Sequence, residues 1–167
     1  MKFKIFIACL LFVGCSSKPE DVIKEKSWFA EEAKTRGIDF IFESGFKDFP
    51  YNPEIISGGV ALLDVDGDLD VDIYFVQGGS IVDKSQTEFA NQLFINDGSG
   101  YFSNGTAGSG AGDTSYGTGV TTGDYDNDGD VDIYITNVNA NVLLRNEGNG
   151  TFVDVTDTAG VGESRWS

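Results

Sequence analysis

Two short segments of the chain carry an aspartate at every second position, and each leads directly into an apolar run. The first aspartate loop is residues 64–72 and the second is residues 124–132. Neighbouring carboxylates a few Å apart repel by roughly 4 kcal/mol per pair at intermediate dielectric. A hard divalent cation relieves that repulsion, and calcium takes six to eight oxygen ligands in a flexible cage. The spacing therefore predicts about one structural calcium ion in each loop.

Counting from the first aspartate of a loop assigns the candidate ligands. Positions 1, 3 and 5 supply side-chain oxygens, position 7 offers its backbone carbonyl, and position 9 closes the site. The candidate ligands in this order are Asp64, Asp66, Asp68, Asp70 and Asp72 in the first loop, and Asp124, Asp126, Asp128, Asp130 and Asp132 in the second.

Position 6 of such a loop needs a residue that tolerates a sharp turn. Gly129 stands there in the second loop, whereas the first loop has Leu69 at position 6 and its glycine, Gly67, at position 4. A leucine in a left-handed backbone conformation is strained. We therefore expect the first loop to be distorted or to bind calcium more weakly than the second.

Other kinds of acidic loop fit the sequence less well. An EF-hand needs a bidentate glutamate at position 12 and flanking helices, but position 12 is Phe75 in the first loop and Ile135 in the second, inside strand patterns. Dockerin and thrombospondin-type loops also need an acid there. The remaining alternative is a solvated acidic turn, which the two matching copies disfavour.

The elements that hold these loops repeat along the chain. The pattern N-x-L-x-x-N-x-G-x-G-x-F runs over residues 91–102 and again over 141–152, and a phenylalanine followed eight residues later by glycine occurs at Phe29, Phe102 and Phe152. Alternating apolar residues and glycine turns indicate about four short strands per 50-residue unit, which is typical of a propeller blade. We predict an all-β fold: a partial β-propeller of about two blades, incomplete over residues 29–167.

These loops and repeats resemble the FG-GAP/VCBS repeat. The layout of residues 36–40, 53–55 and 58–60 before the first loop is similar to bacterial cartilage acidic protein-like proteins, which often carry a C-terminal ASPIC/UnbV domain. The resemblance implies a calcium-bearing propeller like that of integrin α chains. The chain stops just before a third aspartate loop is due, so we expect an N-terminal fragment of a longer protein.

The first residues are typical of a targeting segment. Residues 1–14 contain two lysines and a short apolar stretch and predict a lipoprotein signal peptide that ends before Cys15, the predicted lipidation site. An ordinary cleaved signal peptide is the alternative. Residues 15–28 would be a tether that begins a short helix, which we expect between Glu20 and Arg36, ending at Gly37. The localisation implied is export, at the outer membrane or cell surface of a Gram-negative bacterium.

Charge and composition limit the partners. The net charge of −16 argues against nucleic acid and favours cations, and membrane contact is expected only through the lipid anchor. The leading hypothesis is an exported calcium-binding module for protein or carbohydrate binding and cell adhesion. Inserted loops at residues 39–58 and 78–90 would meet the ligand, with Phe46, Phe49 and Tyr51 as contacts, unless these aromatic rings pack beneath their own loop.

An enzymatic role is not expected within these residues. The chain has no histidine, no free cysteine in the predicted mature domain and no nucleophile elbow. The alternative function is a scaffold for a polysaccharide-active enzyme whose catalytic residues lie in a missing C-terminal portion. A purely structural spacer is a third hypothesis.

Overall fold

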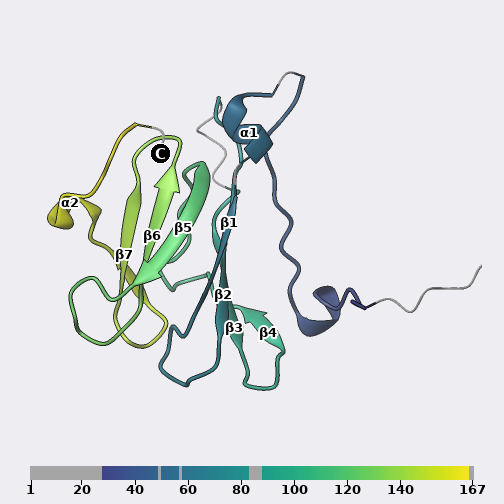
Figure 1. The fold of residues 1–167 in the computed structure, drawn as a ribbon, viewed down its shortest axis with the longest axis vertical. Coiled ribbons are helices and arrows are strands. Elements are labelled where there is room, and N and C mark those ends of the chain that lie inside the picture. Colours follow the sequence, from purple (N-terminus) through teal and green to yellow (C-terminus); the bar gives the residue numbers. More distant parts are fainter. Residues whose placement is uncertain (1–27, 49, 57, 83–87, 166–167) are drawn as a thin grey trace, which may run out of the picture. The chain divides into compact units, whose positions relative to one another are not determined.

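The computed structural model describes residues 28–48, 50–56, 58–82 and 88–165, shown in colour in Figure 1. The chain divides into residues 1–31 and residues 32–167, and all strands and both aspartate loops belong to the second unit. Cys15 and the predicted signal peptide lie outside the described residues. Within the described part, no helix has the length and apolar character that crossing a membrane requires.

The described strands form two four-stranded antiparallel sheets in simple sequential order, as the repeat predicts. The first blade is β1-β2-β3-β4 and the second is β5-β6-β7-β8 (Figure 1). The strands are β1 (Gly59–Leu63), β2 (Asp72–Val76), β3 (Gln92–Asn96), β4 (Phe102–Asn104), β5 (Gly117–Gly123), β6 (Asp132–Asn137), β7 (Val142–Asn146) and β8 (Phe152–Asp154). This confirms the all-β class and the pair of blades.

The two blades repeat residue by residue. In the first blade Ala61 pairs with Tyr74, which pairs with Leu93. In the second blade the same row is Thr121, Tyr134 and Leu143. Side chains alternate between the two faces of a strand, so these matched rows define matched faces of the blades. We call them the tyrosine faces, after Tyr74 and Tyr134.

The opposite faces also correspond. Val60 is paired with Phe75 in the first blade, as Val120 is paired with Ile135 in the second. We call these the valine faces. The main core joins the tyrosine face of the first blade to the valine face of the second, and it contains Ala61, Leu63, Tyr74, Val76 and Leu93 with Ile133, Ile135 and Leu144, flanked by Val120 and Val142. The blades are therefore held together mainly by burial of branched aliphatic side chains.

Helices are few and short. The helix expected between Glu20 and Arg36 is wrong over the part that is described, because residues 28–33 are not helical and only a 3-10 turn, η1 (Lys34–Arg36), is present. Gly37 does end that turn, with φ 90° and its N–H donated to the carbonyl of Lys34. Residues 20–27 of the expected helix lie outside the described residues.

Two helices were not anticipated, α1 (Asn52–Ile56) and α2 (Thr156–Ala159). The first begins inside the inserted loop before β1. Its start is stabilised because Glu54 accepts a hydrogen bond of 2.7 Å from the backbone N–H of Tyr51, which is half of a capping box. Both helices are too short to show a hydrophobic period in the sequence.

Candidate metal centre

Each aspartate loop connects the first and second strands of its blade. The first runs from the end of β1 to the start of β2, and the second runs from the end of β5 to the start of β6. The residues of such a loop are not paired in the sheet, so their side chains are not restricted to the two faces of a strand. The aspartates of each loop can therefore turn toward a common point.

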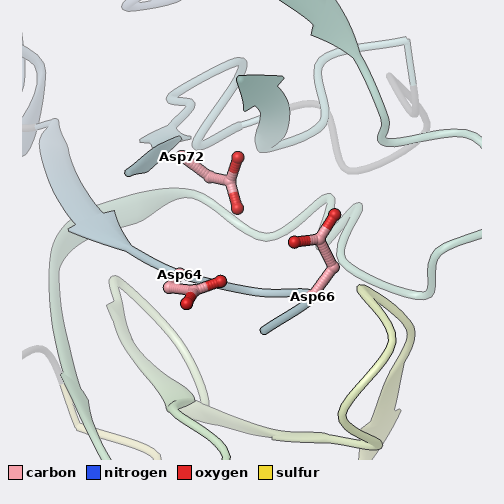
Figure 2. Close-up of side chains that lie close together, drawn as sticks. All are labelled: Asp64, Asp66 and Asp72. Carbon is pink, nitrogen blue, oxygen red and sulfur yellow. The ribbon is translucent and has the colours of Figure 1, made fainter. Parts of the chain in front are cut away.

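The structure gathers three carboxylates in each loop. Asp64, Asp66 and Asp72 form one group, which Figure 2 shows close together at the loop after β1 and the start of β2. Asp124, Asp126 and Asp128 form the other group. In each group one oxygen per carboxylate lies within 4.8 Å of the others. Positions 1 and 3 are shared by both groups, while the third member is position 9 in the first loop and position 5 in the second.

Two further positions complete the predicted ligand sets: position 7, whose predicted ligand atom is the backbone carbonyl, and position 5 of the first loop, which is Asp68. Asp70 and Asp130 lie against the glycine turns that follow β3 and β7, where a Cβ on Gly98 or Gly148 would come within 2.5 Å of the aspartate Oδ2. Asp68 accepts a hydrogen bond of 2.9 Å from the Asp70 N–H. These contacts explain why the repeat carries glycine there, because any side chain would displace the aspartate.

Asp132 is also outside the group of three in its loop. It is buried, and its two oxygens accept hydrogen bonds of 2.8 Å from the N–H groups of Tyr125 and Asn146. Asp72 makes the equivalent bonds to Val65 at 3.0 Å and to Asn96 at 2.8 Å. Position 9 therefore ties its loop to the third strand of the blade, whatever else it binds.

The first aspartate of each loop organises the turn. Asp64 accepts hydrogen bonds from the N–H groups of Gly67 at 2.8 Å and Leu69 at 3.0 Å. Asp124 accepts two such bonds of 3.1 Å, from Asp128 and Gly129. A carboxylate oxygen has two lone pairs, so each still has capacity for a cation.

The backbone of the first loop has the same left-handed positions as the second loop, although one of them is a leucine. Positions 4 and 6 are left-handed in both loops, with φ 77° at Gly67 and 72° at Leu69, and 61° at Asn127 and 100° at Gly129. The expected distortion is therefore absent in this respect. The strain is carried by Leu69 itself, whose side chain is 89% exposed and gains little from burial.

The electrostatics of the loops favour a bound cation. Burial, and next the negative charge of Asp68, raise the pKa of Asp66 above its ordinary value of 3.8. Desolvation and next the charge of Asp128 raise the pKa of Asp126 in the same direction. Burial likewise raises the pKa of Asp72, against the hydrogen bonds from Asn96 and Val65. Each shift means that the ionised carboxylate lacks sufficient compensation.

The donor set fits calcium. Every candidate donor is a hard oxygen, the two groups are compact, and neither contains a nitrogen or sulfur ligand. The groups that the structure brings together could hold a metal ion through Asp64, Asp66 and Asp72 or through Asp124, Asp126 and Asp128.

Two asparagines at the ends of the third strands were not assigned a role from the sequence. The backbone N–H groups of Asn96 and Asn146 donate hydrogen bonds to the position 9 carboxylates. Their side-chain amides donate to the carbonyls of Val71 at 3.1 Å and Val131 at 3.3 Å. The signal was present, because both are the second asparagine of the repeated N-x-L-x-x-N pattern.

The first aspartate loop also contacts the other blade. The carbonyl of Val65 accepts hydrogen bonds from the Asn146 side-chain amide at 3.0 Å and from the Gly150 N–H at 2.8 Å. Val65 is almost fully buried there, whereas Tyr125, its counterpart in the second loop, is 43% exposed. The first loop is thus part of the junction between blades.

The two inserted loops meet on the first blade. The N–H of Gly79 donates to the carbonyl of Glu43 at 2.6 Å, and Gln77 bonds the backbone of Ile41 and Glu43. An open pocket between them is lined by Lys47, Asp48, Tyr51, Glu54 and Ser80, among others. Phe46 and Tyr51 are about half exposed, and Phe49 lies outside the described residues.

Comparison with known proteins identifies the repeat. Residues 64–135 and 124–167 match the family model described as FG-GAP-like repeat. The two matches start at Asp64 and Asp124, the first residues of the two aspartate loops. No curated protein matches the chain.

Proposed function

Because the chain belongs to the FG-GAP-like repeat family, we propose that it is an exported calcium-binding repeat module that binds a protein or glycan at the cell surface. Calcium would be structural, with about one ion per aspartate loop. Lipidation of Cys15 would anchor the module to the membrane. The net charge of −16 would repel nucleic acid, so no nucleic-acid partner is proposed.

The observation that carries the calcium proposal is the equivalence of the two loops. Both gather the carboxylates of positions 1 and 3, both have left-handed backbone at positions 4 and 6, and both fasten position 9 to the third strand. A single catalytic centre would need one such arrangement, whereas a scaffold repeats it in every blade. The repetition therefore favours a structural ion over an active site.

The residues of the chain explain what the ion would do. The loop joins β5 to β6, and Asp132 links the loop to the start of the turn after β7. An ion on Asp124, Asp126 and Asp128 would neutralise the repulsion in this loop and hold the ends of three strands together. Bound calcium stabilises the folded state by mass action, because the unfolded chain has no assembled cage.

The ligand would meet the inserted loops of the first blade. Their pocket presents a half-exposed tyrosine, Tyr51, beside Lys47, Asp48 and Glu54. Binding residues are commonly carried on such loops above a rigid sheet. The rival proposal, a scaffold for a polysaccharide-active enzyme, places its catalytic residues outside this chain.

Calcium binding is tested by titration calorimetry and by the thermal midpoint. Calcium should raise the midpoint of the chain and excess chelator should lower it. The double variant Asp124→Ala, Asp128→Ala should lose one equivalent of calcium and keep the first site. Asp157→Asn, at an exposed position of α2, is the matched control and should change neither quantity. An unchanged midpoint with calcium and chelator would contradict the proposal.

A further inference from the structure

The two inserted loops of the first blade enclose a pocket whose lining mixes apolar and charged groups. The lining residues are Gly45, Lys47, Asp48, Tyr51, Glu54, Ser80 and Val82. We call this the inserted-loop pocket. Its volume is about 250 Å³. Pockets for drug-sized ligands have volumes of roughly 300–1,000 Å³, so this pocket fits a single small ring.

The walls of the inserted-loop pocket are held by hydrogen bonds between the two loops. The N–H of Gly79 donates to the carbonyl of Glu43 at 2.6 Å. The side-chain amide of Gln77 donates to the carbonyl of Ile41 at 2.9 Å and accepts from the N–H of Glu43 at 2.8 Å. Loops that are joined in this way have less conformational freedom to lose when a ligand binds. The pocket is therefore preorganised on the sheet of the first blade.

Two further contacts hold the segment that leads to Lys47. Gly45 has φ 69°, and a Cβ there would overlap the carbonyl of Gly79, so this close approach requires glycine. The hydroxyl of Tyr116, in the linker between the blades, donates to the carbonyl of Ser44 at 3.1 Å. The chain therefore enters the pocket in a position that contacts from both blades determine.

The apolar part of the pocket is aromatic. Tyr51 lines the pocket and is 55% exposed. Phe46, between two lining residues in the chain, is 51% exposed. The face of an aromatic ring is a large apolar surface on a side chain with few rotatable bonds, and it can pack against the C–H groups of a sugar ring.

The polar part of the pocket contains both hydrogen-bond donors and acceptors. Lys47 has an ammonium group, and Asp48 and Glu54 have carboxylates. Glu54 is held in place because its Oε2 accepts a hydrogen bond of 2.7 Å from the N–H of Tyr51. The other oxygen of this carboxylate has lone pairs for a ligand. A hydroxyl group donates and accepts, so a ring with several hydroxyls can pair with all three side chains.

The charge of the pocket argues against an anionic ligand. Two carboxylates face one lysine in the lining, and the whole chain carries a net charge of −16. Phosphorylated, sulfated and uronic acid ligands would be repelled. The size of the pocket argues against a protein ligand, because a stable protein partner covers roughly 800 Å² on each side, far more than one small ring.

We propose that the inserted-loop pocket binds one neutral pyranose unit of a glycan, with the ring stacked on Tyr51 and its hydroxyls bonded to Lys47, Asp48 and Glu54. This inference rests on the proposed function and commits it to a carbohydrate ligand. The pocket shares no residue with either aspartate loop, so calcium is not a ligand of the sugar.

The experiment measures binding of the full chain to soluble glucan, mannan and galactan by affinity electrophoresis, with polygalacturonate as the anionic comparison. At least one neutral polysaccharide should bind, and polygalacturonate should not. Tyr51→Ala should weaken that binding by about tenfold or more, because the stacking surface is lost. Tyr101→Ala is the matched control, because Tyr101 is 51% exposed on the turn between β3 and β4, and it should bind like the wild type.

A second variant keeps the test valid if Tyr51→Ala does not fold. Asp48→Asn changes one exposed side chain and should weaken binding by about threefold to tenfold. Calcium stoichiometry and the thermal midpoint of both variants should equal those of the wild type, which separates this inference from the calcium proposal.

Three results would overturn the inference. The first is a chain that takes up calcium normally and binds none of the neutral polysaccharides. The second is polysaccharide binding of wild-type strength in both Tyr51→Ala and Asp48→Asn, which would place the sugar elsewhere and leave the proposed function intact. The third is binding that disappears when the polysaccharide is first treated with protease, which would identify a protein ligand.

Discussion

The carboxylate of Asp132 accepts a hydrogen bond of 2.8 Å from the backbone nitrogen of Asn146, although the two residues lie on different strands. Asp72 and Asn96 repeat this bond at the same length in the other blade. Both aspartates are 1% exposed. The last aspartate of each loop is therefore first of all a structural group, which fastens the loop to the sheet before any ion binds.

Replacing this group should destabilise the protein with or without calcium. Asp132→Asn leaves one carbonyl oxygen for two backbone donors and sets an amide donor against the N–H of Tyr125 or Asn146. The free energy of unfolding should fall by about 1–3 kcal/mol, the cost of an unsatisfied buried donor. Denaturant unfolding in calcium and in chelator measures it. Asp157→Asn is the control. If the free energy of unfolding falls only in calcium, Asp132 acts chiefly as a calcium ligand.

The leucine of the first loop should be replaceable with a gain in stability. Leu69 has φ 72° and is exposed, so Leu69→Gly removes left-handed strain of about 1–2 kcal/mol and adds about 0.5–1 kcal/mol of chain entropy cost. The net gain in the free energy of unfolding should lie between about 0 and 1.5 kcal/mol. Gly129→Ala is the reverse experiment, and it should destabilise. A destabilised Leu69→Gly variant would show that the leucine side chain makes a favourable contact.

The calcium response should depend on pH through Asp66. Its raised pKa means that the folded state holds the proton more tightly than the unfolded chain, so stability from this group is present at low pH and is lost as the pH rises through the folded pKa. Calcium needs the ionised form. The gain in thermal midpoint caused by calcium should therefore shrink as the pH is lowered, beginning above 3.8.

Asp66→Asn separates these two effects. Without calcium at neutral pH, the variant should have a higher thermal midpoint than the wild type, because no charge is buried at this position and the repulsion from Asp68 is gone. With calcium, its gain should be smaller than that of the wild type. Thermal scans in chelator and in calcium provide the measurement. A lower midpoint in chelator would mean that the charge of Asp66 stabilises the empty loop.

The junction between blades should be sensitive to one methyl group. A Cβ on Gly117 would overlap Cγ1 of Val76, and both residues lie at the start or end of strands that meet across the core. Gly117→Ala should therefore lower the free energy of unfolding by about 1–3 kcal/mol. Val76→Ala also destabilises, because Val76 is buried in the core, but the double variant should lose less than the sum of the two single losses, and a double-mutant cycle gives the coupling. If the two losses of unfolding free energy are strictly additive, the destabilisation by Gly117→Ala does not come from its contact with Val76.

The local features of this protein were predictable from its sequence. Alternation of apolar residues identified the strands, glycine turns identified their ends, and the repeat placed Leu69 and Gly129 at equivalent positions of two loops. These features depend on neighbours within a few residues, so a periodic pattern contains the necessary information. The expected helix failed over residues 28–33 because intrinsic helix propensity is weak and packing decides such segments.

The sequence alone determined that there are two aspartate loops, which residues they contain and that two blades of four strands carry them. Only the tertiary structure decided which carboxylates meet. Asp72 joins the first group while Asp132 does not join the second. The carbonyl of Val65 accepts a hydrogen bond from the side-chain amide of Asn146, at the end of β7 and 81 residues away in the sequence. The physical reason is that these contacts depend on how strands pair and blades pack, which bring together residues that no local pattern relates.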